Sequence, residues 1–373
     1  MTLVGLYAGI GGFELGFQAA GFKTSLLADK DEHCREVLRS RFPNVPVVGD
    51  VADLCNLPVG TSVVTAGFPC QNLSMAGDKL GLEGAKSGDL RHLFELLKFG
   101  GPTLAIENVY FMLHLKKGAA MESLVREVEA LGYKWAYRVV NTLAFGLPQR
   151  RRRVFFVAAM HFDPREALFA DEAGNPPAET PDVDRPIGFY WTEGRKGVGL
   201  AADSIPPLKV ASGLGIPSAP AVLFPDGSVL TPDIESCERL QGFEQGWTGL
   251  NFDTKRSPRW TMVGNAISVP AARWLAGRVM SRGSVLDLTV RPLAPGQPWP
   301  SAAYGGEGLR YAVGASEYPV RDERASIESF RTDEWKPLSA RALRGFISRA
   351  RLGGLKLPPG FMASLETALA RAS

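Results

Sequence analysis

The sequence is poor in the residues that form disulfides and hold metals, with four cysteines and four histidines in 373 residues. The cysteines, at wide and irregular spacing, are Cys34, Cys55, Cys70 and Cys237. So few thiols in a chain of this length give neither the dense framework of a small secreted domain nor the paired ligands of a zinc site. We therefore expect a cytoplasmic protein of a reducing compartment, without disulfides and without a bound metal.

Long apolar runs and targeting signals are also lacking. No segment approaches the roughly 20 apolar residues of a membrane helix. Glu14 interrupts the N-terminal stretch before a signal sequence could be complete. We expect a soluble, unprocessed chain with no membrane partner. Its net charge of +3 permits a polyanionic partner but does not demonstrate one.

Short apolar runs alternate with helical periodicity from the N-terminus to about residue 160. The expected strands cover residues 2–6, 25–27, 63–66, 104–106 and 154–158. This alternation predicts a doubly wound, Rossmann-like α/β domain with a parallel sheet. Between about residues 161 and 229, prolines and glycines interrupt every helical period, which predicts a separate, loop-rich module.

A glycine-rich loop follows the first expected strand and opens a helix, over Gly5–Gly16. Glycine lets backbone amides approach a ligand closely, but Glu14 stands where the dinucleotide fingerprint needs its third glycine. Asp29 ends the next strand, where it could accept hydrogen bonds from ribose hydroxyls, and Asp50 ends a third, where it could read an adenine amine. The set suits S-adenosylmethionine, although either acid could simply cap a helix.

Cys70 stands in the run Gly67–Gln71, directly after an apolar strand over Ser62–Ala66. An ordinary free cysteine is a packed core residue. A proline-bounded turn at the carboxyl end of a strand, followed by glycine-rich sequence over Gln71–Gly88, instead favours a nucleophile beside a closing loop.

Glu107 follows the strand over residues 104–106, so we expect it at the same sheet edge as Cys70. Four arginines precede the next strand, and alternation should send Arg151 and Arg153 to one face and the other two to the opposite face. The ordinary alternatives are a surface ion pair for the glutamate and a solvated charge run for the arginines.

These motifs, in this order, resemble the DNA (cytosine-5)-methyltransferase family of the bacterial modification type. The likeness spans roughly residues 3–160 and 230–280. It rests on six runs: Gly9–Gly12, Pro69–Gln71, Glu107–Val109, Gln149-x-Arg151-x-Arg153, Arg239–Phe243 and Gly264–Pro270.

The resemblance implies a reaction as well as a fold. Cys70 would attack carbon 6 of a flipped cytosine in duplex DNA, and carbon 5 would then take a methyl group from S-adenosylmethionine. Glu107 would engage the ring nitrogen, protonated or hydrogen-bonded, with burial raising its affinity for protons. Arg151 and Arg153 would help hold the flipped base and the nucleophile, and Arg151 is the candidate for the positive charge that a thiolate needs.

The same resemblance implies the cofactor contacts. Tyr7 occupies the position where the family usually stacks phenylalanine on adenine. The implied contact residues are Tyr7, Gly9, Gly11, Gly12, Asp29, Lys30, Asp50, Val51, Pro69, Leu90, Asn265 and Ala266.

The expected domains are a catalytic and cofactor-binding domain (1–160 plus 258–283), a target recognition domain (161–257) and a C-terminal extension (284–373). The best recognition candidate is Gly188–Gly197, where two basic residues adjoin aromatics and could contact phosphates or guanine edges. A packed aromatic turn is the alternative. Pro207-Leu208 stands where the family usually has a Thr-Leu pair.

The C-terminal extension lies outside the resemblance. Leu343, Phe346, Ile347 and Ala350 recur at helical spacing among basic residues, which predicts a basic amphipathic helix. One hypothesis is that its apolar stripe packs on the small domain while its arginines contact DNA phosphates. The alternative is a solvated helix that closes the fold.

We expect a monomer, with a companion restriction endonuclease acting on the same site. Two other functions remain open from the sequence: a tRNA cytosine-5 methyltransferase, and a catalytically silent DNA-binding relative. The recognised DNA sequence does not follow from the residues.

Overall fold

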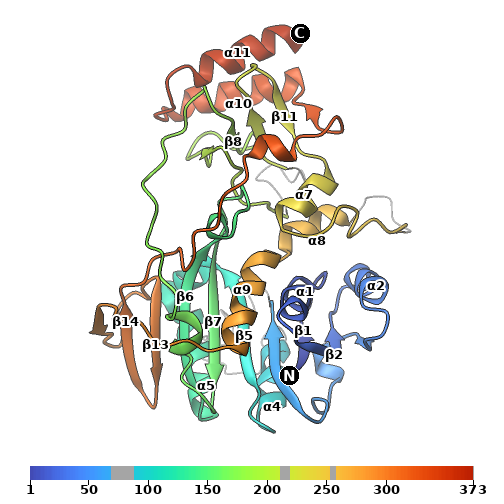
Figure 1. The fold of residues 1–373 in the computed structure, drawn as a ribbon. Coiled ribbons are helices and arrows are strands. Elements are labelled where there is room, and N and C mark those ends of the chain that lie inside the picture. The colour runs from blue at the N-terminus through green and yellow to red at the C-terminus, as the bar shows by residue number, and fades with distance from the viewer. Residues whose placement is uncertain (69–87, 211–218, 253–257, 373) are drawn as a thin grey trace. The chain divides into compact units, whose positions relative to one another are not determined.

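The structure is a computed structural model that describes residues 1–68, 88–210, 219–252 and 258–372. The chain forms two compact units (Figure 1). Unit 1 comprises Met1–Ala144, Arg152–Asn175 and Ile267–Arg321. Unit 2 comprises Phe145–Arg151, Pro176–Ala266 and Asp322–Ser373.

Unit 1 is built on one large mixed sheet, in which β12, β14, β13, β6, β7, β5, β4, β1, β2 and β3 lie in that order. Its strands are β1 (Thr2–Leu6), β2 (Lys23–Ala28), β3 (Val47–Val48), β4 (Thr61–Ala66), β5 (Thr103–Val109), β6 (Lys134–Asn141), β7 (Arg152–Ala159), β12 (Val290–Pro292), β13 (Ala302–Gly306) and β14 (Leu309–Val313). The neighbouring strands from β3 to β5 pair in parallel. This arrangement confirms the Rossmann-like α/β class.

The sheet differs from the expected all-parallel one at β7, which pairs antiparallel with both β5 and β6. The physical reason is the connection from β6 to β7. It is no helical crossover: the chain passes through Phe145–Arg151 of unit 2 and turns back.

The helices of unit 1 are α1 (Gly12–Ala19), α2 (Glu32–Arg41), α4 (Gly88–Leu97), α5 (Ala119–Ala130), α6 (Arg165–Leu168) and α9 (Val269–Met280). Helix α9 returns to the N-terminal part of the sheet by packing on α1. A Cβ atom at Gly16 would lie 2.7 Å from the Cβ atom of Ala272, so only glycine permits this approach.

Unit 1 takes up the first part of the predicted C-terminal extension. Strand β13 pairs antiparallel with β6 and continues the large sheet, with β14 beyond it (Figure 1). The remainder, from Asp322 on, belongs to unit 2. The extension is therefore split between the two units, because its strands pair with the sheet of unit 1 and its apolar helix packs in the core of unit 2.

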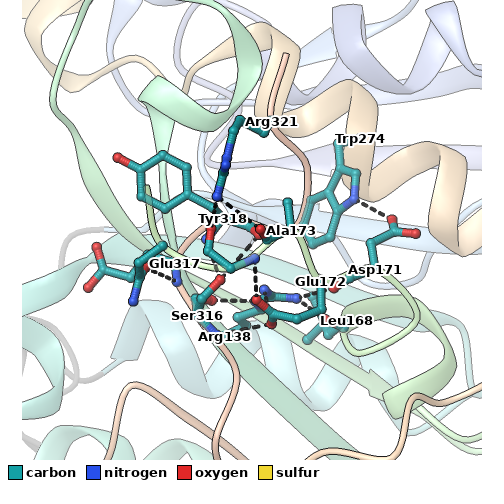
Figure 2. A network of polar contacts seen from close by, with 12 residues as sticks. Arg138, Leu168, Asp171, Glu172, Ala173, Trp274, Ser316, Glu317, Tyr318 and Arg321 are labelled. Carbon is teal, nitrogen blue, oxygen red and sulfur yellow. Dashed lines mark hydrogen bonds and ion pairs between the residues drawn. The ribbon is translucent and has the colours of Figure 1, made fainter. Parts of the chain in front are cut away.

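Arg138 of β6 anchors the two segments of unit 1 from which the chain passes into the longer parts of unit 2. Its fully buried guanidinium donates to the carbonyls of Asp171 (2.6 Å) and Ser316 (2.8 Å) and to the Glu172 carboxylate (2.7 Å). Arg321 adds a hydrogen bond to the Ala173 carbonyl (Figure 2). Both segments are thus fixed to the central sheet just before residues 176 and 322, where unit 2 begins.

Unit 2 has a smaller sheet, ordered β15, β11, β10, β8 and β9, with strands of two or three residues. These are β8 (Ile187–Phe189), β9 (Ala201–Ala202), β10 (Ala221–Leu223), β11 (Val229–Thr231) and β15 (Lys336–Pro337). Its helices are α7 (Ile234–Leu240), α8 (Arg259–Asn265), α10 (Ala340–Gly353) and α11 (Phe361–Ala372). Such short strands match the predicted loop-rich module.

The predicted amphipathic helix is α10, and its predicted apolar stripe of Leu343, Phe346, Ile347 and Ala350 is buried. Phe346 packs against Phe189 of β8 with ring centroids 4.9 Å apart, and Phe361 of α11 completes the cluster. The packing half of the hypothesis about this helix is confirmed. The predicted boundaries also differ at 161–175, which lie in unit 1, and at 258–266, which lie in unit 2.

Among the residues that the structure describes, no helix is long and apolar enough to cross a membrane. Within the same residues, no group of three or more His, Cys, Asp or Glu side chains could hold a metal ion.

Candidate active site

The carboxyl ends of β1 to β5 meet at one edge of the large sheet, because these strands are parallel. In open α/β sheets, ligands bind at this edge. Most of the predicted site residues follow these strands, and those within the described residues can be placed in turn.

The glycine loop after β1 has the backbone conformation of a ligand cradle. Tyr7, Gly9 and Gly11 have φ values of 53°, 56° and 85°, in the left-handed region that glycine tolerates best. A Cβ atom at Gly9 would meet no heavy atom within 4 Å, so the backbone is open there. Gly12 begins α1, and the half-buried Tyr7 ring lies edge-on to Phe68 at 6.0 Å.

Asp29, at the end of β2, ties this loop to the neighbouring strand. Its Oδ2 accepts the Gly9 amide hydrogen (2.7 Å), and its Oδ1 accepts that of Asp31 (2.9 Å). Burial raises the pKa of the Asp29 carboxyl. It does not cap the next helix, because Asp31 occupies the N-cap of α2. The cap alternative therefore fails for Asp29.

Asp50, after β3, caps a short helix, as its alternative interpretation predicts, and also forms an ion pair. Its Oδ1 accepts the Ala52 amide hydrogen (3.0 Å) and so caps the short 3-10 helix η1 (Val51–Asp53), a bond that lowers the pKa of the carboxyl. Its Oδ2 pairs with the Lys30 ammonium at 3.0 Å. Val51 and Leu90 are nearly fully buried in the core cluster of unit 1.

Glu14 lies fully buried beneath the glycine loop. Its Oε1 accepts a hydrogen bond from the Thr65 hydroxyl of β4 (3.0 Å) and fills the space where a Cβ atom of Gly5 would stand. Burial raises the pKa of this carboxyl to about 7, with a smaller contribution from Asp29. The residue that excludes the dinucleotide fingerprint is therefore a link between α1, β1 and β4.

Glu107 lies near the end of β5 and is paired with Arg153 of β7, with 2.9 Å between Oε1 and Nε. The antiparallel register explains the contact: Val109 stands opposite Arg153, and Glu107 is two residues away on the same face. Arg152 points to the other face, where it pairs with Glu317. The predicted alternation thus holds for these two arginines.

Asn108 joins the ends of β4 and β5. Its side-chain amide donates to the Phe68 carbonyl (3.0 Å), two residues before the predicted nucleophile. The sequence alone assigns no role to Asn108, although it lies in the motif Glu107–Val109. Its role depends on the parallel pairing of β4 with β5, which brings Phe68 within reach. Pro69, Cys70 and most of the predicted loop, 71–87, lie outside the described residues.

Arg151 belongs to unit 2, where it joins several of the predicted motifs. Its buried guanidinium donates to the carbonyls of Leu208 (3.2 Å) and Ala266 (2.8 Å). Gln149 donates to Gln241 (3.2 Å) and accepts from the Leu208 amide (3.2 Å). Runs that are far apart in sequence therefore meet around one arginine.

Asn265 and Ala266 also lie in unit 2, at the end of α8. Asn265 is exposed, and the Ala266 amide donates to the Met262 carbonyl (3.1 Å).

Comparison with known proteins agrees with this geometry. Residues 1–183 match the family model described as C-5 cytosine-specific DNA methylase. The type II methyltransferase M2.BsuMI of Bacillus subtilis (strain 168) is 40% identical over 382 residues, covering 98% of this chain and 97% of the relative. The chain belongs to the C-5 cytosine-specific DNA methylase family. It is therefore a DNA (cytosine-5)-methyltransferase, as the six motifs predict.

Two further similarities are weaker. The type II methyltransferase M.HaeII of Haemophilus aegyptius is 26% identical over 304 residues, which cover 74% of this chain and 92% of the relative. The fold resembles that of the S. pombe Dnmt2 methyltransferase, with a TM-score of 0.54 at 14% identity, covering 75% of this chain and 98% of that one.

Proposed function

We propose that this methylase transfers a methyl group from S-adenosylmethionine to carbon 5 of a flipped cytosine in a specific duplex DNA sequence, through a covalent adduct with Cys70. The observation that carries the proposal is the Glu107–Arg153 pair at the end of β5, beside the Asn108 bond that fixes Phe68. The Glu107 carboxylate and Phe68, two residues before the proposed nucleophile, thus lie at one sheet edge.

The residues of unit 1 fit S-adenosylmethionine, which supplies an electrophilic methyl group when bound. The open backbone at Gly9 allows close approach, and Asp29 presents a partly buried carboxylate beside it. Lys30 and Asp50 form a polar pair one strand further along. We assign ribose recognition to Asp29 and adenine recognition to Asp50, with the Tyr7 ring available for stacking.

The chemistry requires four events that these residues can support. The Cys70 thiolate forms a bond to carbon 6, and the ring electrons move to carbon 5, which takes the methyl group. Glu107 holds or protonates the ring nitrogen where charge develops. Loss of the carbon 5 proton then expels the thiolate and restores the ring.

The two arginines take different parts in this proposal. Arg153 holds the Glu107 carboxylate in a fixed orientation. The Arg151 guanidinium donates hydrogen bonds to backbone carbonyls, which supports a positioning role in unit 2 over direct contact with the base. We assign target recognition to unit 2 and chemistry to unit 1.

We further infer that the methylase works as a monomer in a restriction-modification system, where a companion endonuclease cuts the same sequence when it is unmethylated. The relatives M2.BsuMI and M.HaeII, both type II methyltransferases, support the restriction-modification part of this inference.

Methyl transfer to duplex DNA and to tRNA, measured in parallel with labelled donor, tests the substrate. We expect incorporation into duplex DNA alone. Bisulfite sequencing of a host that expresses the protein should show one methylated sequence motif. Incorporation into tRNA alone would replace the proposal with the tRNA alternative, and none with either substrate would favour the silent relative.

A further inference from the structure

Unit 2 presents a basic turn between β8 and β9. Arg195 and Lys196 are exposed at this turn, and the next acidic residue along the chain is Asp203. The one acid before them in the turn, Glu193, is paired with Lys209. The turn therefore offers two cations for which the described residues contain no ion-pair partner.

The aromatic residues at the start of the turn contact neighbouring segments of unit 2. The Tyr190 hydroxyl donates to the Pro207 carbonyl (2.7 Å), and the Trp191 indole donates to the Ala219 carbonyl (3.2 Å). The Lys209 ammonium lies 3.6 Å from the centre of the Tyr190 ring. These contacts fix the aromatic part, and two backbone carbonyls of the turn receive further support from helix α10.

Arg349 of α10 supplies that support. Its Nη2 donates to the Trp191 carbonyl (2.8 Å), and its Nε donates to the Glu193 carbonyl (3.1 Å). One planar guanidinium therefore bridges two carbonyls of the turn, a geometry that a lysine ammonium does not reproduce. Because the Arg349 guanidinium is directed at the turn, Arg349 affects a ligand only by ordering the turn.

Glycines make this close approach possible. A Cβ atom at Gly353 would lie 2.6 Å from the Gly194 carbonyl oxygen, and one at Gly194 would lie 2.9 Å from the Arg349 Cβ. Gly345 leaves room for the guanidinium, whose Nη1 lies 3.1 Å from where its Cβ would be. The helix itself is rigidly held, since Phe346 and Ile347 are buried in the core of unit 2.

We propose that the Trp191–Gly197 turn is a DNA-contacting element and that Arg349 is the positioning residue that orders it, so that Arg195 and Lys196 contact duplex DNA. Helix α10 thereby contributes to recognition. This inference rests on the proposed function, and it revises the hypothesis that the arginines of α10 all serve as phosphate contacts.

The first test removes the cations. The double variant Arg195→Gln/Lys196→Gln should bind duplex DNA at least tenfold more weakly. If both side chains contact phosphates, the slope of log K against log salt should fall by about 1.8, at about 0.9 per phosphate. Affinity for S-adenosylmethionine and the melting temperature should stay unchanged. Arg344→Gln is the matched control, because Arg344 is exposed on α10 and makes no contact with the turn among those described.

The second test separates positioning from charge. Arg349→Gln and Arg349→Lys should both raise the KM for DNA about tenfold while kcat at saturating DNA changes less than twofold. If Arg349 contacted phosphate directly, the lysine variant would retain wild-type affinity. A double-mutant cycle adds a sharper readout: Arg349→Gln should have no further effect on DNA affinity when Arg195 and Lys196 are already replaced.

The outcomes distinguish this inference from the function on which it rests. Wild-type protein that methylates no duplex DNA would overturn the proposed function. Wild-type protein that methylates DNA, together with unchanged binding by Arg195→Gln/Lys196→Gln, would overturn the turn alone. Wild-type behaviour of Arg349→Lys, or additive effects in the cycle, would overturn the role of Arg349.

Discussion

Glu14 is the buried carboxyl whose ionisation should control the stability of unit 1 near neutral pH. Its pKa rises from the ordinary value of 4.5 to about 7 because folding removes the carboxyl from water. At about 1.36 kcal/mol per pH unit, this difference corresponds to roughly 3 kcal/mol. The group is fully buried, so solvent does not screen the effect.

The sign follows from proton binding. Between about pH 4.5 and pH 7 the folded protein holds a proton on Glu14 that the unfolded chain has lost, so raising the pH disfavours the fold. Glutamine cannot ionise. Relative to wild type, Glu14→Gln should therefore gain about 2–3 kcal/mol of stability between pH 5 and pH 8.5.

The assay is urea unfolding of both proteins across this pH range, with the difference in unfolding free energy plotted against pH. Asp287→Asn, an exposed carboxyl-to-amide change in unit 1, serves as the control for the substitution itself. A poor fit of the amide beside Gly5 would shift the whole Glu14→Gln curve without changing its slope. A flat curve for Glu14→Gln would refute the reasoning.

Four further variants test other parts of the structure. Arg138→Ala should lower the unfolding free energy by about 3–5 kcal/mol, because it leaves the Glu172 carboxylate without the guanidinium that pairs with it; denaturant titration measures this, and a loss below 1 kcal/mol would contradict it. Asp29→Ala should weaken S-adenosylmethionine binding about 10- to 100-fold in calorimetry, the effect of losing hydrogen bonds to a charged group, whereas unchanged affinity would remove Asp29 from the cofactor site. Asn108→Ala should lower kcat at least tenfold with cofactor affinity unchanged, because it frees the Phe68 carbonyl near the nucleophile; a normal kcat would show that this bond is dispensable. Cys70→Ala should abolish turnover and retain cofactor binding, and loss of both together would mean that Cys70 is misplaced.

The strands and the order of the motifs could be predicted from the sequence because their signals are local. An apolar run such as that around Val64 identifies a buried strand, and the residue that follows it must emerge at the strand's end. The glycines at positions 9 and 11 similarly indicate their own backbone conformation. These local rules were sufficient to bring Asp29, Asp50 and Glu107 to one sheet edge.

The remaining features depend on partners that are distant in the sequence. The antiparallel direction of β7 follows from the excursion of residues 145–151 into unit 2, which no local periodicity reports. Arg151 lies in a run of four arginines that suggests a solvated surface, yet its guanidinium donates hydrogen bonds to the carbonyls of Leu208 and Ala266. The division of the C-terminal extension likewise depends on strand pairing with β6, and only the folded chain shows it.

The central claim is that Cys70 forms a covalent bond to cytosine, and a trapping experiment tests it most directly. Duplex DNA in which 5-fluorocytosine replaces the target base cannot lose a proton from carbon 5, so the adduct should accumulate after methyl transfer. Wild-type protein with S-adenosylmethionine should give a denaturation-resistant protein–DNA complex, and Cys70→Ala should give none. The mechanism would be contradicted if the wild-type protein methylates a given sequence but forms no such complex with its 5-fluorocytosine form at saturating cofactor.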